Sequence, residues 1–389
     1  MRIAFFSETF LPHTDGIVTR LCHTLSHLQS KHADHLLVVA PQLPGAQTSY
    51  QGIPVLRVPS FSLPFYPDFY LGLPLLHERI RAVLDTFRPD IIQAVNPVGG
   101  IGHLALRYAE RQGVPLVASY NTDLPHYARY YGFGVFEPLL WSYLRWIHNR
   151  AALNLCPSRP VQERLQAHGI QHITLWRSGI DAGQFHPQWR SQVWRERLTN
   201  GNPDATILLY VGRVASEKRI ERIIKALPQL PGCHLAIVGN GPAMLHLQHL
   251  AECQPVTFLG TLKGKDLTAA YASADIFALA SITETFGFVT LEALTSGLPV
   301  VAAKQGGTLD LVLDGHNGLL FEPDSTEDMV AALRCLAESP DKRHSMGQAA
   351  RQFAEDGAWT WEAATDDLRA HYTELVQAAA ARTQVGIAV

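Results

Sequence analysis

Two glutamates and two cations in the second half of the chain are the residues best suited to chemistry. Glu284 and Glu292 have seven residues between them in the stretch TETFGFVTLEALTSG, and Arg213 and Lys218 lie close together in VGRVASEK. Carboxylates accept hydrogen bonds from ligand hydroxyls. Two fixed cations can hold a diphosphate and neutralise its charge as it leaves. Taken alone, each pair is also explained by solvated surface charge, so the elements that position these residues matter.

The pattern around the two glutamates predicts a loop followed by a short helix. Apolar residues recur at helical spacing through 289–294, and Gly297 with a proline two residues later is a typical helix stop. Glu284 is then expected on the loop, residues 286–287 at the helix entrance, and Glu292 in the first turns. A helix entrance presents free N–H groups and partial positive charge, which suits a phosphate.

Short apolar runs and helical patterns alternate through the chain, which is typical of doubly wound α/β domains. A chain of 389 residues is too long for one core, so two domains are expected. The expected buried strands are residues 3–6, 35–40, 55–58, 91–95, 116–119, 153–157 and 173–175, followed by 207–211, 234–238, 256–259, 276–279, 299–302 and 318–321. Residues 176–204 are interpreted as the interdomain linker and residues 359–381 as a final helix.

Three further segments have distinct compositions. Residues 59–74 are rich in proline and aromatic residues, which argues against a long regular element. Residues 120–131 are expected as a polar loop at the carboxyl end of a strand, where ligands bind in open α/β sheets. Residues 136–152 form an amphipathic helix pattern with tryptophan and arginine. Such a helix packs on a sheet or lies on a membrane surface.

Composition and the absence of several motifs exclude other classes of protein. A net charge of −3 gives no indication of nucleic-acid binding, and five scattered cysteines without a CxxC pair indicate reduced thiols. No apolar run approaches the roughly 20 residues that cross a bilayer. There is no P-loop motif, no complete GxGxxG and no GxSxG. We therefore expect a cytoplasmic protein with possible contact to a membrane surface.

The chain contains eighteen histidines, which raises the question of a metal site. His23 and His27 fall on one face of a predicted helix, as do His246 and His249, but no HExxH occurs and no cysteine lies at ligand spacing. We interpret these histidines as core or solvated residues rather than as metal ligands.

Six motifs are shared with a known family. They are DG at 15–16, VGR with EK at 211–218, GNGP at 239–242, ETFGFVTLE at 284–292, SGLPVVA with GG at 296–307, and GLLFEP at 318–323. On these motifs the chain resembles the retaining family-four glycosyltransferases. The resemblance covers nearly the whole chain and implies the GT-B fold, in which two Rossmann-like α/β domains face a cleft.

The resemblance also implies domain boundaries and donor-side roles. It places an acceptor-side domain at residues 1–180, a nucleotide-sugar domain at 181–358, and a helix at 359–389 that crosses back to the first domain. Arg213 and Lys218 would hold the donor diphosphate. The resemblance also implies that Glu284 and the backbone of Phe286, Gly287 and Phe288 bind the donor sugar, with Val289 beside them. It places Glu292 at the ribose, Leu262 near the base and Gly16 near the phosphates.

One departure from the family concerns the acceptor side. Many relatives have histidine where this chain has Asn121, and an amide cannot act as a base. Asn121 and Asp123 are therefore assigned to the acceptor side, with no protein base named. The leaving phosphate can itself take the acceptor's proton.

Within the family, the chain is similar to the sulfoquinovosyltransferases of plant and cyanobacterial sulfolipid synthesis, over residues 175–201, 261–275 and 281–307. This implies transfer of sulfoquinovose from UDP-sulfoquinovose to diacylglycerol at a membrane surface, with no cofactor and no metal. Candidate cations for the sulfonate are Lys304, Arg57 and Arg129.

Two alternatives stay open. One is an α-mannosyl- or α-glucosyltransferase that makes another glycolipid. The other is a non-catalytic sugar-nucleotide-binding protein, which the intact glutamates and cations disfavour.

Overall fold

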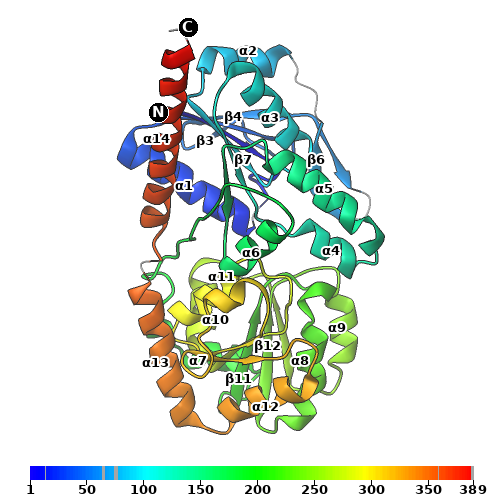
Figure 1. Ribbon diagram of the computed structural model, residues 1–389. Helices are drawn as coiled ribbons and strands as arrows, with labels where there is room; N and C mark the ends of the chain where they lie inside the picture. Colours follow the sequence, from blue (N-terminus) through cyan, green and yellow to red (C-terminus); the bar gives the residue numbers. More distant parts are fainter. Residues whose placement is uncertain (14, 64–65, 74–77, 358, 387–389) are drawn as a thin grey trace. The chain divides into compact units, whose positions relative to one another are not determined.

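The chain folds into two compact units, each built on a largely parallel sheet. A computed structural model describes residues 1–13, 15–63, 66–73, 78–357 and 359–386 (Figure 1). One unit, here called unit 1, comprises Met1–Gly179 with Trp361–Val389, and unit 2 comprises Ile180–Thr360. The predicted α/β class is confirmed in both units.

The sheet of unit 1 has the strand order β10-β9-β8-β7-β1-β2-β4-β3. Its strands are β1 (Arg2–Ser7), β2 (His35–Pro41), β3 (Ser49–Tyr50), β4 (Ile53–Val58), β7 (Ile91–Val95), β8 (Leu116–Ser119), β9 (Leu153–Cys156) and β10 (Ile173–Leu175). All neighbours pair in parallel except β3 with β4. The order reverses direction between β1 and β7, which is a topological switch point.

Helices cover both faces of this sheet. They are α1 (Gly16–His32), α2 (Glu78–Phe87), α3 (Gly100–Gln112), α4 (Leu124–Tyr130), α5 (Glu137–His148), α6 (Arg159–Ala167) and α14 (Trp361–Gly386). Side chains of β1 alternate between two cores, with Ile3 and Phe5 on the face that receives α1 and α14, and Ala4 and Phe6 on the opposite face. This two-sided burial explains why the strands read as continuous apolar runs.

The described part of the proline-rich segment 59–74 forms only short elements, as expected, namely the antiparallel strands β5 (Ser60–Leu63) and β6 (Tyr66–Gly72). Proline is tolerated there because both strands of a two-stranded sheet are edges. The expected loop 120–131 contains helix α4, whose N-cap Asp123 accepts a hydrogen bond from the His126 N–H at 3.2 Å.

Unit 2 has a six-stranded parallel sheet in the order β13-β12-β11-β14-β15-β16. Its strands are β11 (Thr206–Val211), β12 (Cys233–Val238), β13 (Val256–Gly260), β14 (Ile276–Leu279), β15 (Val300–Ala303) and β16 (Gly318–Phe321). Its helices are α7 (Gln192–Leu198), α8 (Ile220–Ala226), α9 (Met244–Leu250), α10 (Gly264–Ser273), α11 (Phe288–Thr295), α12 (Thr326–Ala337) and α13 (Pro340–Asp356). This is the Rossmann order, with its switch point between β11 and β14.

Candidate functional site

The loops that follow β11 and β14 carry three of the predicted donor residues. Arg213 and Lys218 follow β11, and Glu284 follows β14. These two strands are neighbours in the sheet and flank the switch point of unit 2. Ligands of open α/β sheets bind outside the carboxyl ends of strands at such a point. The topology therefore brings together residues that are separated by 66 positions in the chain.

Lys218 and Glu284 form an ion pair. The Lys218 ammonium donates to Glu284 Oε1 at 2.6 Å, and the two side chains are only 15% and 13% exposed. Burial alone would raise the pKa of Glu284, but the charge of Lys218 and its hydrogen bond outweigh burial and lower that pKa. The carboxylate therefore stays ionised at neutral pH and holds the ammonium in one place.

Arg213 has a carboxylate of its own. Its guanidinium lies 4.0 Å from Glu217 Oε1, and the Glu217 side chain is 1% exposed. Burial lowers the pKa of Arg213, and the charge of Glu217 opposes that shift. Each cation of this loop thus has a carboxylate nearby, at hydrogen-bond distance for Lys218 and at 4.0 Å for Arg213.

Glu292 lies inside α11 and pairs with a tyrosine that sequence reasoning did not single out. The Tyr271 hydroxyl, on α10, donates to Glu292 Oε2 at 2.7 Å. Burial raises the pKa of Glu292 to about 7, and the hydrogen bond from Tyr271 opposes this shift. Glu292 can therefore gain or lose a proton near neutral pH, and in its charged form it is a strong acceptor for a ligand hydroxyl.

The entrance of α11 has the conformation that the sequence pattern predicts. Gly287 is its N-cap and adopts the left-handed region, with φ of 93°. A side chain at that position would be strained. The rings of Phe286 and Phe288 meet edge to face with centroids 5.1 Å apart, and Val289 lies in the first turn, half-buried against the core. The first N–H groups of α11 are thus held by a rigid entrance.

A glycine pair packs against the backbone of the Glu284 loop. Gly307 N–H donates to the Glu284 carbonyl at 2.7 Å. A Cβ on Gly306 would lie 2.5 Å from that same carbonyl oxygen, and a Cβ on Gly307 would lie 2.5 Å from Phe286 Cα. Only glycine allows this close approach, so the GG motif at 306–307 fixes the loop that holds Glu284.

The remaining donor-side predictions fall at two places. Leu262 follows β13 in unit 2 and packs, half-buried, against the core. Gly16 is the first residue of α1 in unit 1, where the Asp15 carboxylate caps the helix by accepting from the Val18 N–H at 2.8 Å. The Asp-Gly motif is therefore a helix N-cap followed by the first helical residue.

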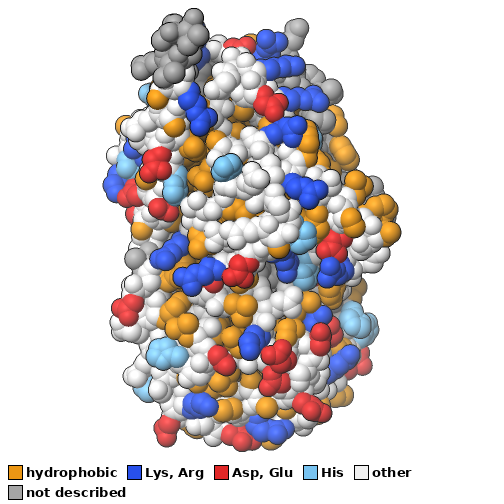
Figure 2. Space-filling view, in the orientation of Figure 1, with side chains coloured by type: hydrophobic (Ala, Val, Ile, Leu, Met, Phe, Trp, Pro, Cys, Tyr) orange, Lys and Arg blue, Asp and Glu red, His pale blue; other side chains and the backbone are white. Residues whose placement is uncertain are grey.

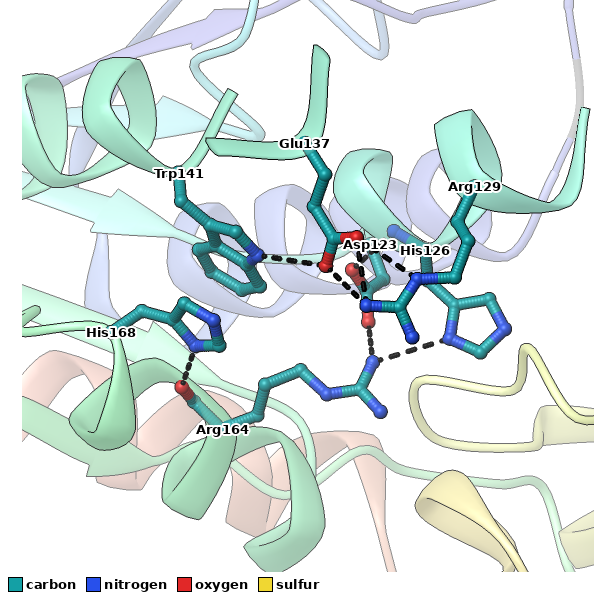
Figure 3. A pocket seen from close by; sticks show the side chains of 7 residues that line it. All are labelled: Asp123, His126, Arg129, Glu137, Trp141, Arg164 and His168. Carbon is teal, nitrogen blue, oxygen red and sulfur yellow. Dashed lines mark hydrogen bonds and ion pairs between the residues drawn. The ribbon is translucent and has the colours of Figure 1, made fainter. Parts of the chain in front are cut away.

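The acceptor-side prediction Asp123 lies in a pocket of unit 1. The pocket measures about 130 Å³, and Figure 3 shows its lining side chains. They are Asp123, His126, Arg129, Glu137, Trp141, Arg164 and His168. Arg164, from α6, pairs with the Asp123 carboxylate, while Arg129 makes a bidentate contact to Glu137. The pocket thus combines two arginine–carboxylate pairs with a stacked tryptophan and histidine, whose ring centroids are 3.6 Å apart.

Asn121 is held by backbone and side-chain contacts near the same strand end. Its amide nitrogen donates to Ser119 Oγ at 3.1 Å, and its N–H donates to the Asn96 side-chain oxygen at 3.4 Å. It is not among the residues that line the pocket of Figure 3.

The three candidate sulfonate cations have other partners. Arg57 donates to the carbonyls of Leu11, Pro41 and Gln47. The Lys304 ammonium lies 3.7 Å from a carboxylate oxygen of Glu322, and more than half of that lysine side chain is exposed. Arg57 therefore braces the surrounding loops, whereas Lys304 stays accessible.

Comparison with known families now adds to this geometry. Residues 14–184 match Glycosyltransferase Family 4, and residues 194–353 match Glycosyl transferases group 1. The sulfoquinovosyl transferase SQD2 of Arabidopsis thaliana is 37% identical over 95% of this chain and 72% of its own length. The chain belongs to the group 1 and family 4 glycosyltransferases. A GDP-mannose-dependent alpha-mannosyltransferase of Mycolicibacterium smegmatis is 35% identical, over 96% of this chain and 97% of that protein.

Solved structures of other glycosyltransferases share the fold. Sucrose-phosphate synthase of Thermosynechococcus elongatus superposes with a TM-score of 0.80 at 20% identity, covering 97% of this chain and 99% of that one. HepE of Anabaena, solved with UDP and glucose, gives 0.75 at 20% identity, covering 96% and 100%. These likenesses confirm the GT-B fold class for this glycosyltransferase.

Three partners in this glycosyltransferase escaped sequence reasoning. Glu217 is one of them, although it lies between the two predicted cations and faces Arg213 at helical spacing. Tyr271 and Arg164 are the others, and they lie 21 and 41 positions from the residues they contact. Only the strand order could have revealed these two.

Proposed function

We propose that the protein is a retaining glycosyltransferase that moves sulfoquinovose from UDP-sulfoquinovose to diacylglycerol. The observation that carries the proposal is the fixed Lys218–Glu284 pair beside Arg213 at the switch point of unit 2. Two positioned cations there suit a nucleotide diphosphate. The choice of sugar and acceptor is supported by the 37% identity to the Arabidopsis sulfoquinovosyl transferase.

In this proposal, the chain's residues act mainly through electrostatics. The bond between the sugar and the diphosphate breaks towards an oxocarbenium-like state, and negative charge grows on the diphosphate. Arg213 and Lys218 stabilise that charge because their positions are set before the reaction. The leaving phosphate accepts the proton of the acceptor hydroxyl on the same face of the sugar, so the configuration is retained and no protein base is needed. Glu292 binds the ribose, and Glu284 orients Lys218 and the sugar.

A lipid acceptor requires access to a membrane, and unit 1 offers an apolar surface for it. Tyr131, Phe133, Val135, Phe136, Leu139 and Trp146 are large hydrophobic residues that are each more than 40% exposed. They come from the end of α4, the 3-10 helix η1 (Gly134–Phe136) and α5. Figure 2 shows hydrophobic side chains gathered along that edge of unit 1.

The same segment carries arginines, and aromatic residues with arginine suit the lipid interface. Within the described residues, no helix is both long and apolar enough to cross a membrane. We therefore propose that α4, η1 and α5 rest on the lipid surface and bring diacylglycerol to the pocket of Asp123.

A second candidate function is transfer of mannose to a glycolipid acceptor. It is favoured by the mannosyltransferase of Mycolicibacterium smegmatis, which this chain covers over nearly its full length at 35% identity. Arg213, Lys218 and Glu284 would act in the same way with this donor, because their proposed contacts are to diphosphate and sugar hydroxyls.

The test is a donor panel with the purified protein and vesicles that contain diacylglycerol. UDP-sulfoquinovose, UDP-glucose and GDP-mannose are supplied separately, and labelled lipid and released nucleotide are both measured. Labelled lipid from the sulfonated donor alone supports the first proposal. Labelled lipid from GDP-mannose alone replaces it with the second, and nucleotide release without labelled lipid rejects diacylglycerol as the acceptor.

A further inference from the structure

Two histidines of α1 converge on an aspartate of α14 in unit 1. His27 Nε2 lies 2.9 Å and His32 Nε2 lies 2.7 Å from the same atom, Asp366 Oδ1. The two imidazole rings meet edge to face with centroids 5.6 Å apart. Among the described residues, these three form the group whose ligand atoms all lie within 4.8 Å of one another. The sequence had suggested only that His27 shares a helix face with His23.

This arrangement has the chemistry of a transition-metal site. Two imidazole nitrogens and one carboxylate oxygen are a common three-ligand set for Zn²⁺, with bonds of about 2.0–2.2 Å. Tetrahedral bonds of that length separate ligand atoms by about 3.3 Å. The distances from the two Nε2 atoms to Asp366 Oδ1 are thus roughly half an ångström shorter than in a zinc site. Small side-chain rotations would lengthen them enough for an ion to bind. The side chains are 12%, 21% and 37% exposed for His27, His32 and Asp366, which leaves a path for an ion.

The second oxygen of the aspartate is already held. The Lys31 ammonium donates to Asp366 Oδ2 at 2.6 Å. A partner on the free oxygen of a ligating carboxylate fixes its orientation, as second-layer groups of metal sites do. The positive charge of Lys31 also opposes a nearby cation, so this residue orients the ligand and weakens the affinity at the same time.

We propose that His27, His32 and Asp366 bind a zinc ion that joins helix α14 to helix α1. When the ion binds, it takes the place of the proton on each Nε2. A neutral ring keeps that proton on Nδ1 instead, and a protonated ring releases it to water. A water molecule completes the fourth position. All three ligands belong to unit 1, and none of them lines the pocket of Asp123. The ion therefore shares no ligand with the proposed donor and acceptor sites. Its effect is to fasten the C-terminal helix.

The direct test is Zn²⁺ titration of the full chain, after treatment with a chelator, in competition with a chromophoric zinc indicator. We expect one ion per chain, and an affinity at least about tenfold weaker in His32→Gln and in Asp366→Asn. Co²⁺ should give the intense visible bands of a tetrahedral site in the wild type and lose them in both variants. The two variants alter different helices, so one of them still tests the site if the other fails to fold by circular dichroism.

Two matched variants separate a metal site from a cluster of paired charges. His23→Gln removes a histidine of the same helix that stacks on Trp361 at 4.5 Å and should leave zinc binding unchanged. Lys31→Gln should tighten zinc binding, because it removes a positive charge, although it breaks an ion pair. The proposal is overturned if Asp366→Asn binds zinc as tightly as wild type, or if Lys31→Gln binds it more weakly than wild type. It is also overturned if zinc raises the thermal midpoint of His32→Gln as much as that of wild type.

Discussion

The ammonium of Lys218 donates to Glu284 Oε1 at 2.6 Å, so an ion pair within unit 2 holds this cation. An ammonium has three donors, so Lys218 has the capacity to donate to a diphosphate while it stays paired with Glu284. Glu284 thus removes the freedom of a flexible side chain, and the cation does not have to be positioned during the reaction.

Loss of the paired cation should slow transfer more than it weakens binding. We expect Lys218→Ala and Arg213→Ala each to lower kcat by a factor on the order of 10²–10³, by analogy with the loss of one oxyanion-hole donor. Steady-state kinetics with the active donor measures this. Lys225→Ala is the matched control, because Lys225 is an exposed lysine on the neighbouring helix α8 and should retain full activity. An Arg213→Ala protein with undiminished kcat rejects the assignment.

Glu292 should make unfolding free energy depend on pH. Its pKa is raised to about 7 in the fold, so the protonated form is favoured there. The stability it contributes is fully present below the ordinary carboxyl pKa of about 4.5, and is lost as pH rises through 7. Glu292→Gln keeps an acceptor for Tyr271 and cannot ionise. The free energy of unfolding of Glu292→Gln, minus that of wild type, should therefore rise by up to about 3 kcal/mol as the pH is raised from 4.5 to 8.

Urea unfolding at several pH values measures that difference. Glu8 in unit 1 also has a pKa raised to about 7 by burial, so the wild-type curve alone does not isolate Glu292. Glu8→Gln is therefore the companion variant, and the effects of the two substitutions should add because they lie in different units. Parallel pH curves for wild type and Glu292→Gln contradict the assignment. The same variant should raise KM for the donor, because it loses the carboxylate proposed for the ribose.

The sequence predicted the main strands and the entrance of α11, but not helix α4 or the partners of the candidate site residues. The strands were predicted within about two residues at each end, because each is a short apolar run and the inner ones, such as β7 and β12, are buried along their whole length. The entrance of α11 was predicted because glycine and the helix stop mark its ends. Helix α4 was missed because its seven residues are too few to show a period. Asp123 followed by proline in the first turn is the N-cap signal that could have revealed it.

The proposed membrane surface should lose affinity when it carries charge. Phe136→Asp with Leu139→Asp replaces two apolar side chains that are more than half exposed, so folding should be little affected. Each buried apolar side chain contributes about 1.5–3 kcal/mol to insertion, so flotation with phosphatidylglycerol and galactolipid vesicles should show binding weakened at least about tenfold. Leu245, on α9 of unit 2, is also more than half exposed, so Leu245→Asp is the control and should float like wild type. Equal flotation of all three proteins rejects this surface.

Asp123 should affect the acceptor and not the donor. Asp123→Ala removes the N-cap of α4 and leaves Arg164 without its carboxylate, so we expect transfer to fall about tenfold or more through a higher acceptor KM. Asp123→Asn keeps a good N-cap side chain but not the charge, and so separates the two roles. Donor affinity, measured by calorimetry, should be unchanged in both variants, because the proposed donor cations belong to unit 2. If Asp123→Asn behaves like wild type and Asp123→Ala does not, the residue acts through helix α4 alone. If both variants weaken donor binding instead, the assignment of this pocket to the acceptor is wrong.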